Sequence, residues 1–256
     1  MNMFMQYSVV RAVPAVALIG SVFLSMSSQA AIALDRTRVI FDGSVQSVSL
    51  SVSNQNKQLP YLAQGWLEDA QGNKIQSPLA VLPPVQRIEP GKPSQVKIQA
   101  LPAAKMLPQD RETLYYFNLR EIPPKSNKPN SLQIALQTRI KLFYRPAAIA
   151  PERNAAPWQE LLTLTRQGDK YIVNNPTPYY VTLIDAATRK GVEGAKGFEP
   201  FMVPPKGSAP LTVSAASVGG SPVLTYINDY GGRPQLSFSC SGSSCKVVPD
   251  KNSAAN

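Results

Sequence analysis

The strongest constraint on the fold of this chain is an alternation of apolar and polar side chains with a period of two. From Leu132 to Tyr144 the even positions are Leu, Ile, Leu, Thr, Ile, Leu and Tyr, and the odd positions are mostly polar. Successive side chains of a β-strand point to opposite faces, whereas a helix has a period of 3.6. The segment is about twice the usual strand length of ~5–6 residues. We therefore expect one long strand that serves two neighbours or projects past its own sheet.

Shorter alternating segments recur along the chain, each bounded by Gly, Pro or Asn clusters that are typical of turns. We expect strands at 48–52, 61–67, 96–98, 114–119, 161–165, 171–173, 179–184, 223–227 and 236–240. The 24 prolines argue against long helices, because an interior proline removes a backbone hydrogen bond and clashes with the preceding turn. Helix is expected only near residues 103–107. The fold class is therefore all-β.

A stretch rich in Pro and Ala divides the chain. Residues 145–151 read Arg-Pro-Ala-Ala-Ile-Ala-Pro, and residues 154–157 continue this composition. The lengths before and after the stretch each suit one β-sandwich. We expect two domains, at residues 31–147 and 148–256.

The first thirty residues are predicted to be a secretory signal peptide. Arg11 is the only charge, an apolar run of about 13 residues follows, and small residues end at Ala30. A membrane anchor is the alternative, but spanning a bilayer needs roughly 20 apolar residues. We expect cleavage after Ala30 and export of the mature chain.

Export favours a disulfide between Cys240 and Cys245, since the two enclose only Ser-Gly-Ser-Ser and would meet an oxidising compartment. The spacing does not match a C-x-x-C redox motif. Closing so short a loop removes little chain entropy, so the bond should add less than the usual ~2–4 kcal/mol. We expect it to clamp a terminal hairpin.

The composition excludes much enzyme chemistry. The sequence has no histidine, which excludes Ser-His-Asp and Cys-His catalysis and every His-ligated metal site, and two cysteines cannot complete a structural zinc site. Glycine-rich phosphate loops and the G-x-S-x-G elbow are missing too. We predict no catalytic residue, metal or cofactor. A Ser-Lys hydrolase is the enzyme type that the composition leaves open.

The formal net charge is +10, but Lys and Arg are dispersed without a basic run or an aromatic–basic array. Solvated surface charge explains this pattern better than nucleic-acid binding. No segment after the signal peptide approaches the length of a membrane span. We expect neither nucleic acid nor the membrane interior as a partner.

One segment resembles a family signature. Residues 107–123 read Leu-Pro-Gln-Asp-Arg-Glu-Thr-Leu-Tyr-Tyr-Phe-Asn-Leu-Arg-Glu-Ile-Pro, which is similar to the signature of the periplasmic chaperones of the chaperone–usher pathway, which assemble adhesive pili. Further segments with the same resemblance are 35–38, 57–64, 83–87, 132–146, 175–181 and 226–234. They cover nearly the whole chain after the signal peptide.

The resemblance implies two immunoglobulin-like sandwiches in a boomerang arrangement with a cleft between them. In this family a pilus subunit lacks the last strand of its own fold, and the chaperone lends one. Leu132, Ile134 and Leu136 match the apolar residues of that donor strand. An exposed apolar strand is normally an aggregation hazard, so a function for it is expected. Burial of the three residues in the chaperone's own core is the alternative that periodicity alone favours.

The family anchors the terminal carboxylate of the subunit with one Arg and one Lys, which match Arg38 and Lys141. Arginine can grip a carboxylate with two hydrogen bonds, and lysine adds a point charge. A regular strand would place Lys141 on the face opposite Leu132, so a bulge or a change of pairing is implied. Arg36 shares a face with Arg38 if that stretch is extended, but it does not match the anchor.

Glu112, Arg145 and Asp229 match the family's charge network between the domains, although each could be an ordinary solvated charge. The loop at residues 120–131 is short, which resembles the subfamily that serves thick, rod-like pili. The function implied is binding of pilus subunits and delivery to an outer-membrane usher in the periplasm. An exported adhesin or a pilus structural subunit, also immunoglobulin-like, is the alternative. Self-association of the free protein stays open.

Overall fold

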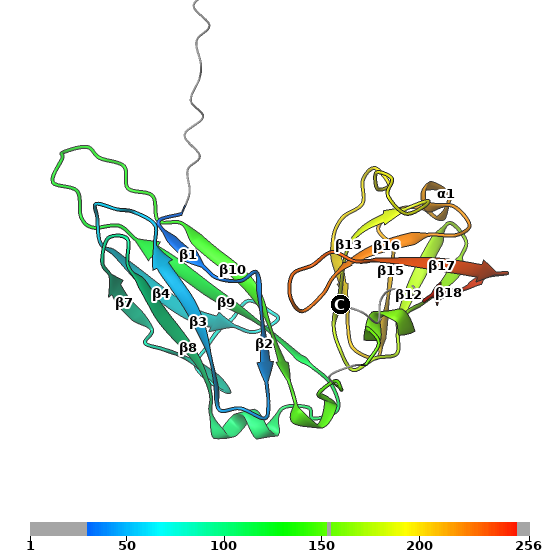
Figure 1. Cartoon of the computed structure of the whole chain (residues 1–256), viewed down its shortest axis with the longest axis horizontal. Coiled ribbons are helices and arrows are strands. Elements are labelled where there is room, and N and C mark those ends of the chain that lie inside the picture. The colour runs from blue at the N-terminus through cyan, green and yellow to red at the C-terminus, as the bar shows by residue number, and fades with distance from the viewer. Residues whose placement is uncertain (1–29, 153–154, 250–256) are drawn as a thin grey trace, which may run out of the picture.

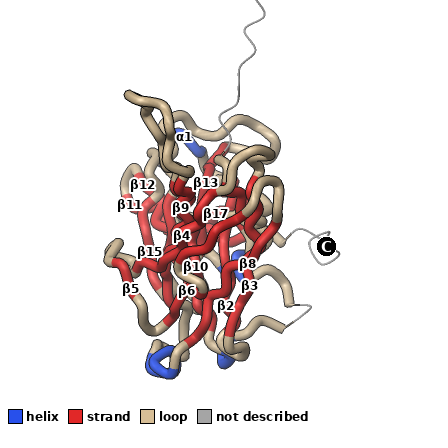
Figure 2. Tube along the Cα trace, turned by 90° about the vertical axis from the view of Figure 1, so that its left-hand side faces the viewer, coloured by secondary structure: helices blue, strands red, loops and turns tan. Residues whose placement is uncertain are grey.

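The computed structural model describes residues 30–152 and 155–249, and these form two β-rich domains (Figure 1). The signal peptide predicted for residues 1–30 lies outside this part except for Ala30. Strands run through both domains, and helix is confined to short pieces (Figure 2). Within the described residues, no helix has the length and apolar character needed to cross a membrane.

The first domain is built from two sheets. The first contains strands in the order β1-β3-β8-β6, and the second in the order β2-β10-β9-β4-β5, with β7 also pairing with β4. The strands are β1 (Ile32–Leu34), β2 (Arg38–Asp42), β3 (Ser47–Asn54), β4 (Tyr61–Glu68), β5 (Lys74–Ile75), β6 (Leu79–Leu82), β7 (Val85–Ile88), β8 (Pro93–Ala100), β9 (Thr113–Ile122) and β10 (Gln137–Arg145). A 3-10 helix, η1 (Pro102–Met106), precedes β9, where the sequence predicted helix.

Alternation places the core of this domain between the two sheets. Leu50 and Val52 point inward from β3 while the intervening serines face outward, as the period of two requires. Phe41, Phe117 and Leu142 are fully buried in the same core from the second sheet. Burial of apolar surface between the sheets is the main stabilising contribution.

The second domain forms one continuous sheet in the order β14-β13-β16-β17-β18-β11-β12-β15. The sheet folds back on itself, so that β14 at one end also contacts β12 and β15 at the other. Its strands are β11 (Thr163–Gln167), β12 (Lys170–Asn175), β13 (Val181–Ala187), β14 (Phe201–Val203), β15 (Gly207–Pro210), β16 (Val223–Ile227), β17 (Gln235–Ser241) and β18 (Ser244–Val248). Short helices are η2 (Ala147–Ile149), η3 (Trp158–Leu161) and α1 (Ala215–Val218). A separate apolar core includes Leu164, Leu183, Leu224 and Phe238.

The long strand predicted over residues 132–144 is shorter than expected. Strand β10 begins only at Gln137, where the ladder with β9 starts opposite Arg120. The parallel ladder with β2 starts later still, at Lys141. Residues 132–136, called here the exposed segment, therefore have no partner strand within the described part of the chain. Among the described residues, one backbone hydrogen bond connects this segment to the sheet, in which Glu121 N–H donates to the Leu136 carbonyl (3.0 Å).

Two other strand predictions shift in the second domain. The strand predicted at 161–165 begins at Thr163, because Pro157 starts the 3-10 turn η3 just before it. The strand predicted at 179–184 begins at Val181 and runs to Ala187. The strands β1, β2, β5, β6, β7, β14, β15 and β18, all of two to five residues, were not predicted.

A disulfide joins Cys240 and Cys245, which lie directly opposite one another in the hairpin of β17 and β18. The Cys245 side chain is buried in the core of the second domain. The bond therefore fixes the register of a terminal hairpin and closes a short loop.

Replacing both cysteines by serine should lower the melting temperature of the second domain by at most about 15 °C, because a loop this short is worth about 2 kcal/mol or less. The first domain should melt unchanged, since no cysteine lies in it. Differential scanning calorimetry of the exported protein measures both transitions. Two free thiols in the natively exported protein would contradict the premise.

Candidate binding site

Two cations meet at the edge of the first domain that faces the second. Arg38 is the first residue of β2, and Lys141 lies in the middle of β10. The two strands pair in parallel with Arg38 and Lys141 as direct Cα partners. Adjacent side chains in this register share one face of the sheet, so the fold brings together two residues that are about a hundred positions apart in the sequence.

Both side chains are half-buried, and neither forms a salt bridge with a carboxylate among the described residues. Arg38 Nη1 donates to the Ile227 carbonyl at 3.4 Å, whereas the buried Arg38 Nε has no hydrogen-bond partner. Burial lowers the pKa of Arg38 from its ordinary value, partly offset by Asp229. Burial also lowers the pKa of Lys141, and the Arg38 charge lowers it further. Two desolvated cations with an unused donor are suited to binding an anion.

The exposed segment leads away from these cations along the line of β10. Leu132 is 88% exposed, Ile134 is 66% exposed and Leu136 is 37% exposed. The alternation of β10 would place these residues on the core face, together with Ile140 and Leu142. They are exposed instead because the ladder with β9 begins only at Gln137 and the ladder with β2 only at Lys141. The bulge that the spacing implied is not found between residues 137 and 145, where both ladders are continuous.

An open edge lies between the exposed segment and the two cations. Strand β10 pairs with β9 from Gln137, but β2 joins its other side only from Lys141. A cavity of about 410 Å³ lies beside this stretch, lined partly by Ile32, Thr138 and Ile140. The geometry therefore leaves room for a further strand along the first part of β10.

Three charges join the two domains. Arg145, the last residue of β10, binds Glu112 at 2.7 Å and Asp229 at 2.8 Å. The Arg145 and Glu112 side chains are only 6% and 2% exposed, so the pair is buried. Glu112 also accepts a hydrogen bond from Tyr180 N–H at 2.8 Å. The structure thus brings together the three network residues that the sequence singled out.

The Arg145 end of this network is buried among aromatic rings. The Arg145 guanidinium lies 4.9 Å from the ring centroids of both Trp158 and Tyr179. Burial raises the pKa of Glu112 to about 7, an effect that Arg145 only partly offsets. The two aromatic contacts were missed at the sequence level, because Trp158 follows the Pro/Ala-rich stretch and carries no local pattern.

Replacing Asp229 with asparagine should loosen the contact between the domains without unfolding either one. The change removes the half of the network that is partly exposed and leaves the buried Arg145–Glu112 pair intact. We expect a loss of about 1–2 kcal/mol in coupling between the domains. Small-angle scattering should show a broader distribution of interdomain distances.

The matched control is Asp110→Asn, which breaks an exposed salt bridge between the domains, from Asp110 to Lys206 (2.7 Å), together with the local pair of Asp110 and Arg111 (3.0 Å). This exposed pair should contribute much less to the coupling between the domains than the Asp229 contact does. Equal effects of the two variants would show that burial of the network does not fix the domain arrangement.

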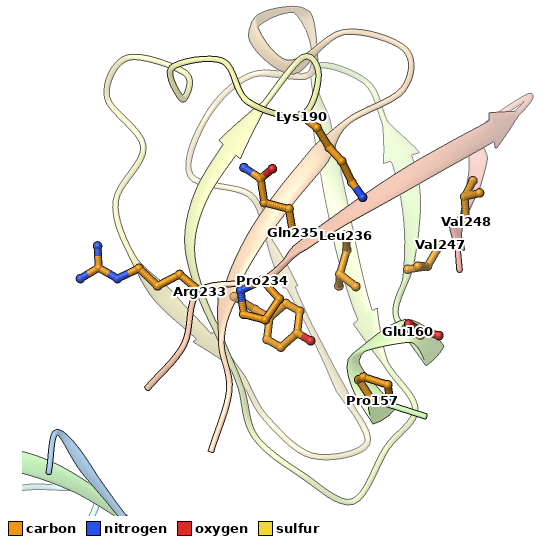
Figure 3. A pocket seen from close by; sticks show the side chains of 10 residues that line it. Pro157, Glu160, Lys190, Arg233, Pro234, Gln235, Leu236, Val247 and Val248 are labelled. Atoms are coloured by element: carbon orange, nitrogen blue, oxygen red, sulfur yellow. The ribbon is translucent and has the colours of Figure 1, made fainter. Parts of the chain in front are cut away.

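A further cavity, of about 430 Å³, lies in the second domain. Figure 3 shows Lys190 at one end, Val247 and Val248 along one side, and Pro157 and Glu160 at the other end. It does not include Arg38 or Lys141. Among the described residues, no group of three or more Cys, Asp or Glu side chains is placed to hold a metal ion.

The fold and this site define a class of protein: two immunoglobulin-like domains that present an exposed apolar segment beside an open strand edge. The chain matches the family described as "Pili and flagellar-assembly chaperone, PapD N-terminal domain" over residues 31–150. It also matches "Pili assembly chaperone PapD, C-terminal domain" over residues 157–238. The chain belongs to this family of pilus-assembly chaperones.

Similar proteins of known sequence carry chaperone names. The chain is 55% identical to "Probable fimbrial chaperone YfcS" of Escherichia coli (strain K12) over 228 residues, 89% of this chain and 90% of that protein. It is 52% identical to "Chaperone protein PapD" of Escherichia coli over 232 residues, 90% of this chain and 95% of that protein. These matches confirm the resemblance and favour a chaperone over a structural subunit.

Solved structures that match the fold of this chain are also those of chaperones. The periplasmic chaperone SfaE matches with a TM-score of 0.65 and 33% identity, covering 80% of this chain and 98% of that one. The SafB chaperone complex with the SafA pilin of Salmonella enterica matches with a TM-score of 0.68 and 28% identity, covering 84% of this chain and 98% of the matched one. The all-β, two-domain prediction is therefore confirmed.

Proposed function

We propose that this chaperone works in the periplasm, where it binds pilus subunits by donating the exposed segment and delivers them to an outer-membrane usher. The observation that carries the proposal is the exposure of Leu132, Ile134 and Leu136 on a stretch that continues a well-paired strand. Exposed apolar side chains at alternate positions are costly in a free protein and invite aggregation. A partner that buries all three would remove that cost.

The partner is expected to add a strand. Extended backbone without a partner can form main-chain hydrogen bonds with an incoming sheet, while alternate side chains fill its pockets. Pairing of chaperone and pilin by this route is one of the general examples of strand addition. An incomplete immunoglobulin-like subunit offers the groove that the three apolar residues would fill.

Arg38 and Lys141 would fix the register of the added strand by binding its terminal carboxylate. They lie where β2 joins β10, at the inner end of the open edge. A strand whose carboxyl end is held there must extend back toward residue 132. It would therefore run parallel to β10. A slip of one residue would turn the three apolar side chains out of the groove.

The proposals that the protein works in the periplasm and delivers subunits to an usher are supported by its sequence and by its similarity to known chaperones. The signal peptide predicted for residues 1–30 would export the chain, and the disulfide suits an oxidising compartment. We infer that the chaperone acts on subunits by binding alone, without catalysis or a cofactor. The role of Glu112, Arg145 and Asp229 would be to hold the domains at the angle that admits a subunit.

Co-purification from periplasm tests the proposal. A pilus-producing strain that expresses the tagged full chain should yield an equimolar complex, and mass spectrometry should identify the second chain as a pilus subunit. Adding purified usher should then release the subunit from the chaperone. Recovery of the chaperone alone, although subunits are present in the same periplasm, would contradict the proposal.

A further inference from the structure

A nearly fully exposed aromatic ring stands at the cleft between the domains. Tyr230, in the connection from β16 to β17, is 98% exposed. It lines a cavity of about 620 Å³ together with Arg38 and Ile40 of the first domain. Exposure this high means that the ring contributes little to either core, so packing does not explain its position.

The backbone around Tyr230 is held in place. The Asn228 side chain accepts hydrogen bonds from Tyr230 N–H (3.1 Å) and Gly232 N–H (2.7 Å), and Asn228 N–H donates to the Gly232 carbonyl (3.0 Å). Such Asx-type bonds stabilise a tight turn. The backbone that carries the ring is therefore ordered before any partner arrives, which reduces the backbone entropy lost on binding.

The turn also abuts the first domain. Gly231 has a φ of +85°, which favours glycine, and a Cβ placed there would lie 3.0 Å from Thr37 Oγ1. Thr37 immediately precedes Arg38 at the start of β2. The turn thus places Tyr230 on the same cavity as Arg38, the side chain that we propose binds the subunit's carboxylate.

We propose that Tyr230 binds the side chain of the last residue of the subunit, and that this residue is apolar. The inference rests on the proposed function, because it takes the terminal carboxylate to lie at Arg38. A carboxylate at that position brings the terminal residue into the cavity that Tyr230 and Ile40 line. Asp35, Arg36 and Asp229 also line the cavity, but Asp35 is paired with Arg36 and Asp229 with Arg145. The tyrosine ring and the isoleucine side chain supply its apolar surface.

A cycle of two chaperones and two peptides tests this contact. The peptides are synthetic twelve-residue strands of alternating valine and serine with a free carboxylate, identical except for a final leucine or glycine. Calorimetry should show that the wild-type chain binds the leucine peptide about tenfold more tightly, since burying that side chain is worth on the order of 1.4 kcal/mol or more. In Tyr230→Ala the preference should fall to about twofold.

Controls separate the contact from folding and from the proposed function. Tyr230→Ala should melt at the wild-type temperature, and Met106→Ala, which removes another exposed apolar side chain outside this cavity, should keep the tenfold preference. Arg38→Ala should weaken both peptides alike. An undiminished preference in Tyr230→Ala would overturn the inference alone. Unchanged binding of both peptides by Arg38→Ala would instead overturn the proposed function.

Discussion

Arg38→Ala and Lys141→Ala should each abolish pilus assembly while the chaperone itself stays folded. Neither side chain forms a salt bridge within the described residues, so its removal breaks no ion pair in the free protein. A hydrogen bond from a charged donor to a bound carboxylate is worth about 1.5–3 kcal/mol. Loss of the anchor also frees the added strand to slip, so the total cost should exceed that of the bonds alone.

The double variant should be little worse than either single variant, because both residues act on one carboxylate. Subunit recovered with the chaperone, counted per chaperone, measures the effect, and a thermal melt verifies the fold. Arg36→Ala is the matched control: it lies two residues from Arg38 but pairs with Asp35 at 2.7 Å. Assembly at the wild-type level in Arg38→Ala would contradict the anchor.

Ile134→Asp should leave the free chaperone as stable as the wild type and prevent subunit binding. Ile134 is 66% exposed, so a charge at this position is solvated in the free protein. In a complex the same charge would enter an apolar groove without a partner, at a cost of several kcal/mol. A thermal melt and co-purification of the subunit measure the two effects separately.

Ala135→Asp is the control for this position, because residue 135 points to the other face of an extended strand and should tolerate a charge. Collapse of the free Ile134→Asp protein would place Ile134 in the core and contradict strand donation. Equal loss of binding in both variants would show that any added charge in the segment weakens binding. It would contradict the claim that only alternate side chains enter the subunit's groove.

Periodicity predicted the strands well where one face is buried and the other is solvated. Leu50 and Val52 alternate with serines in β3, and that alternation reports directly on which side chains are buried. It failed at Leu132, Ile134 and Leu136, which have the pattern of buried residues but are exposed. A period shows that a strand has an apolar face, but it cannot show whether the surface that covers that face belongs to the same chain.

The candidate site was predictable only through the family resemblance. Arg38 and Lys141 lie far apart in the sequence, and only the parallel pairing of β2 with β10 brings them together. No local pattern could indicate that pairing, because β2 is short and its partner is distant. The aromatic surroundings of Arg145 were unpredictable for the same reason, since Trp158 and Tyr179 reach it from separate elements.

The central claim is that a subunit binds through its terminal carboxylate, and calorimetry with two forms of one peptide tests it most directly. The peptide copies the C-terminal strand of the co-purified subunit and is prepared as the free acid and as the amide. The amide removes the charge but keeps every side chain. The account predicts that the free acid binds at least tenfold more tightly, because Arg38 and Lys141 lose their anion in the amide complex. Equal affinity of the two forms would contradict the account.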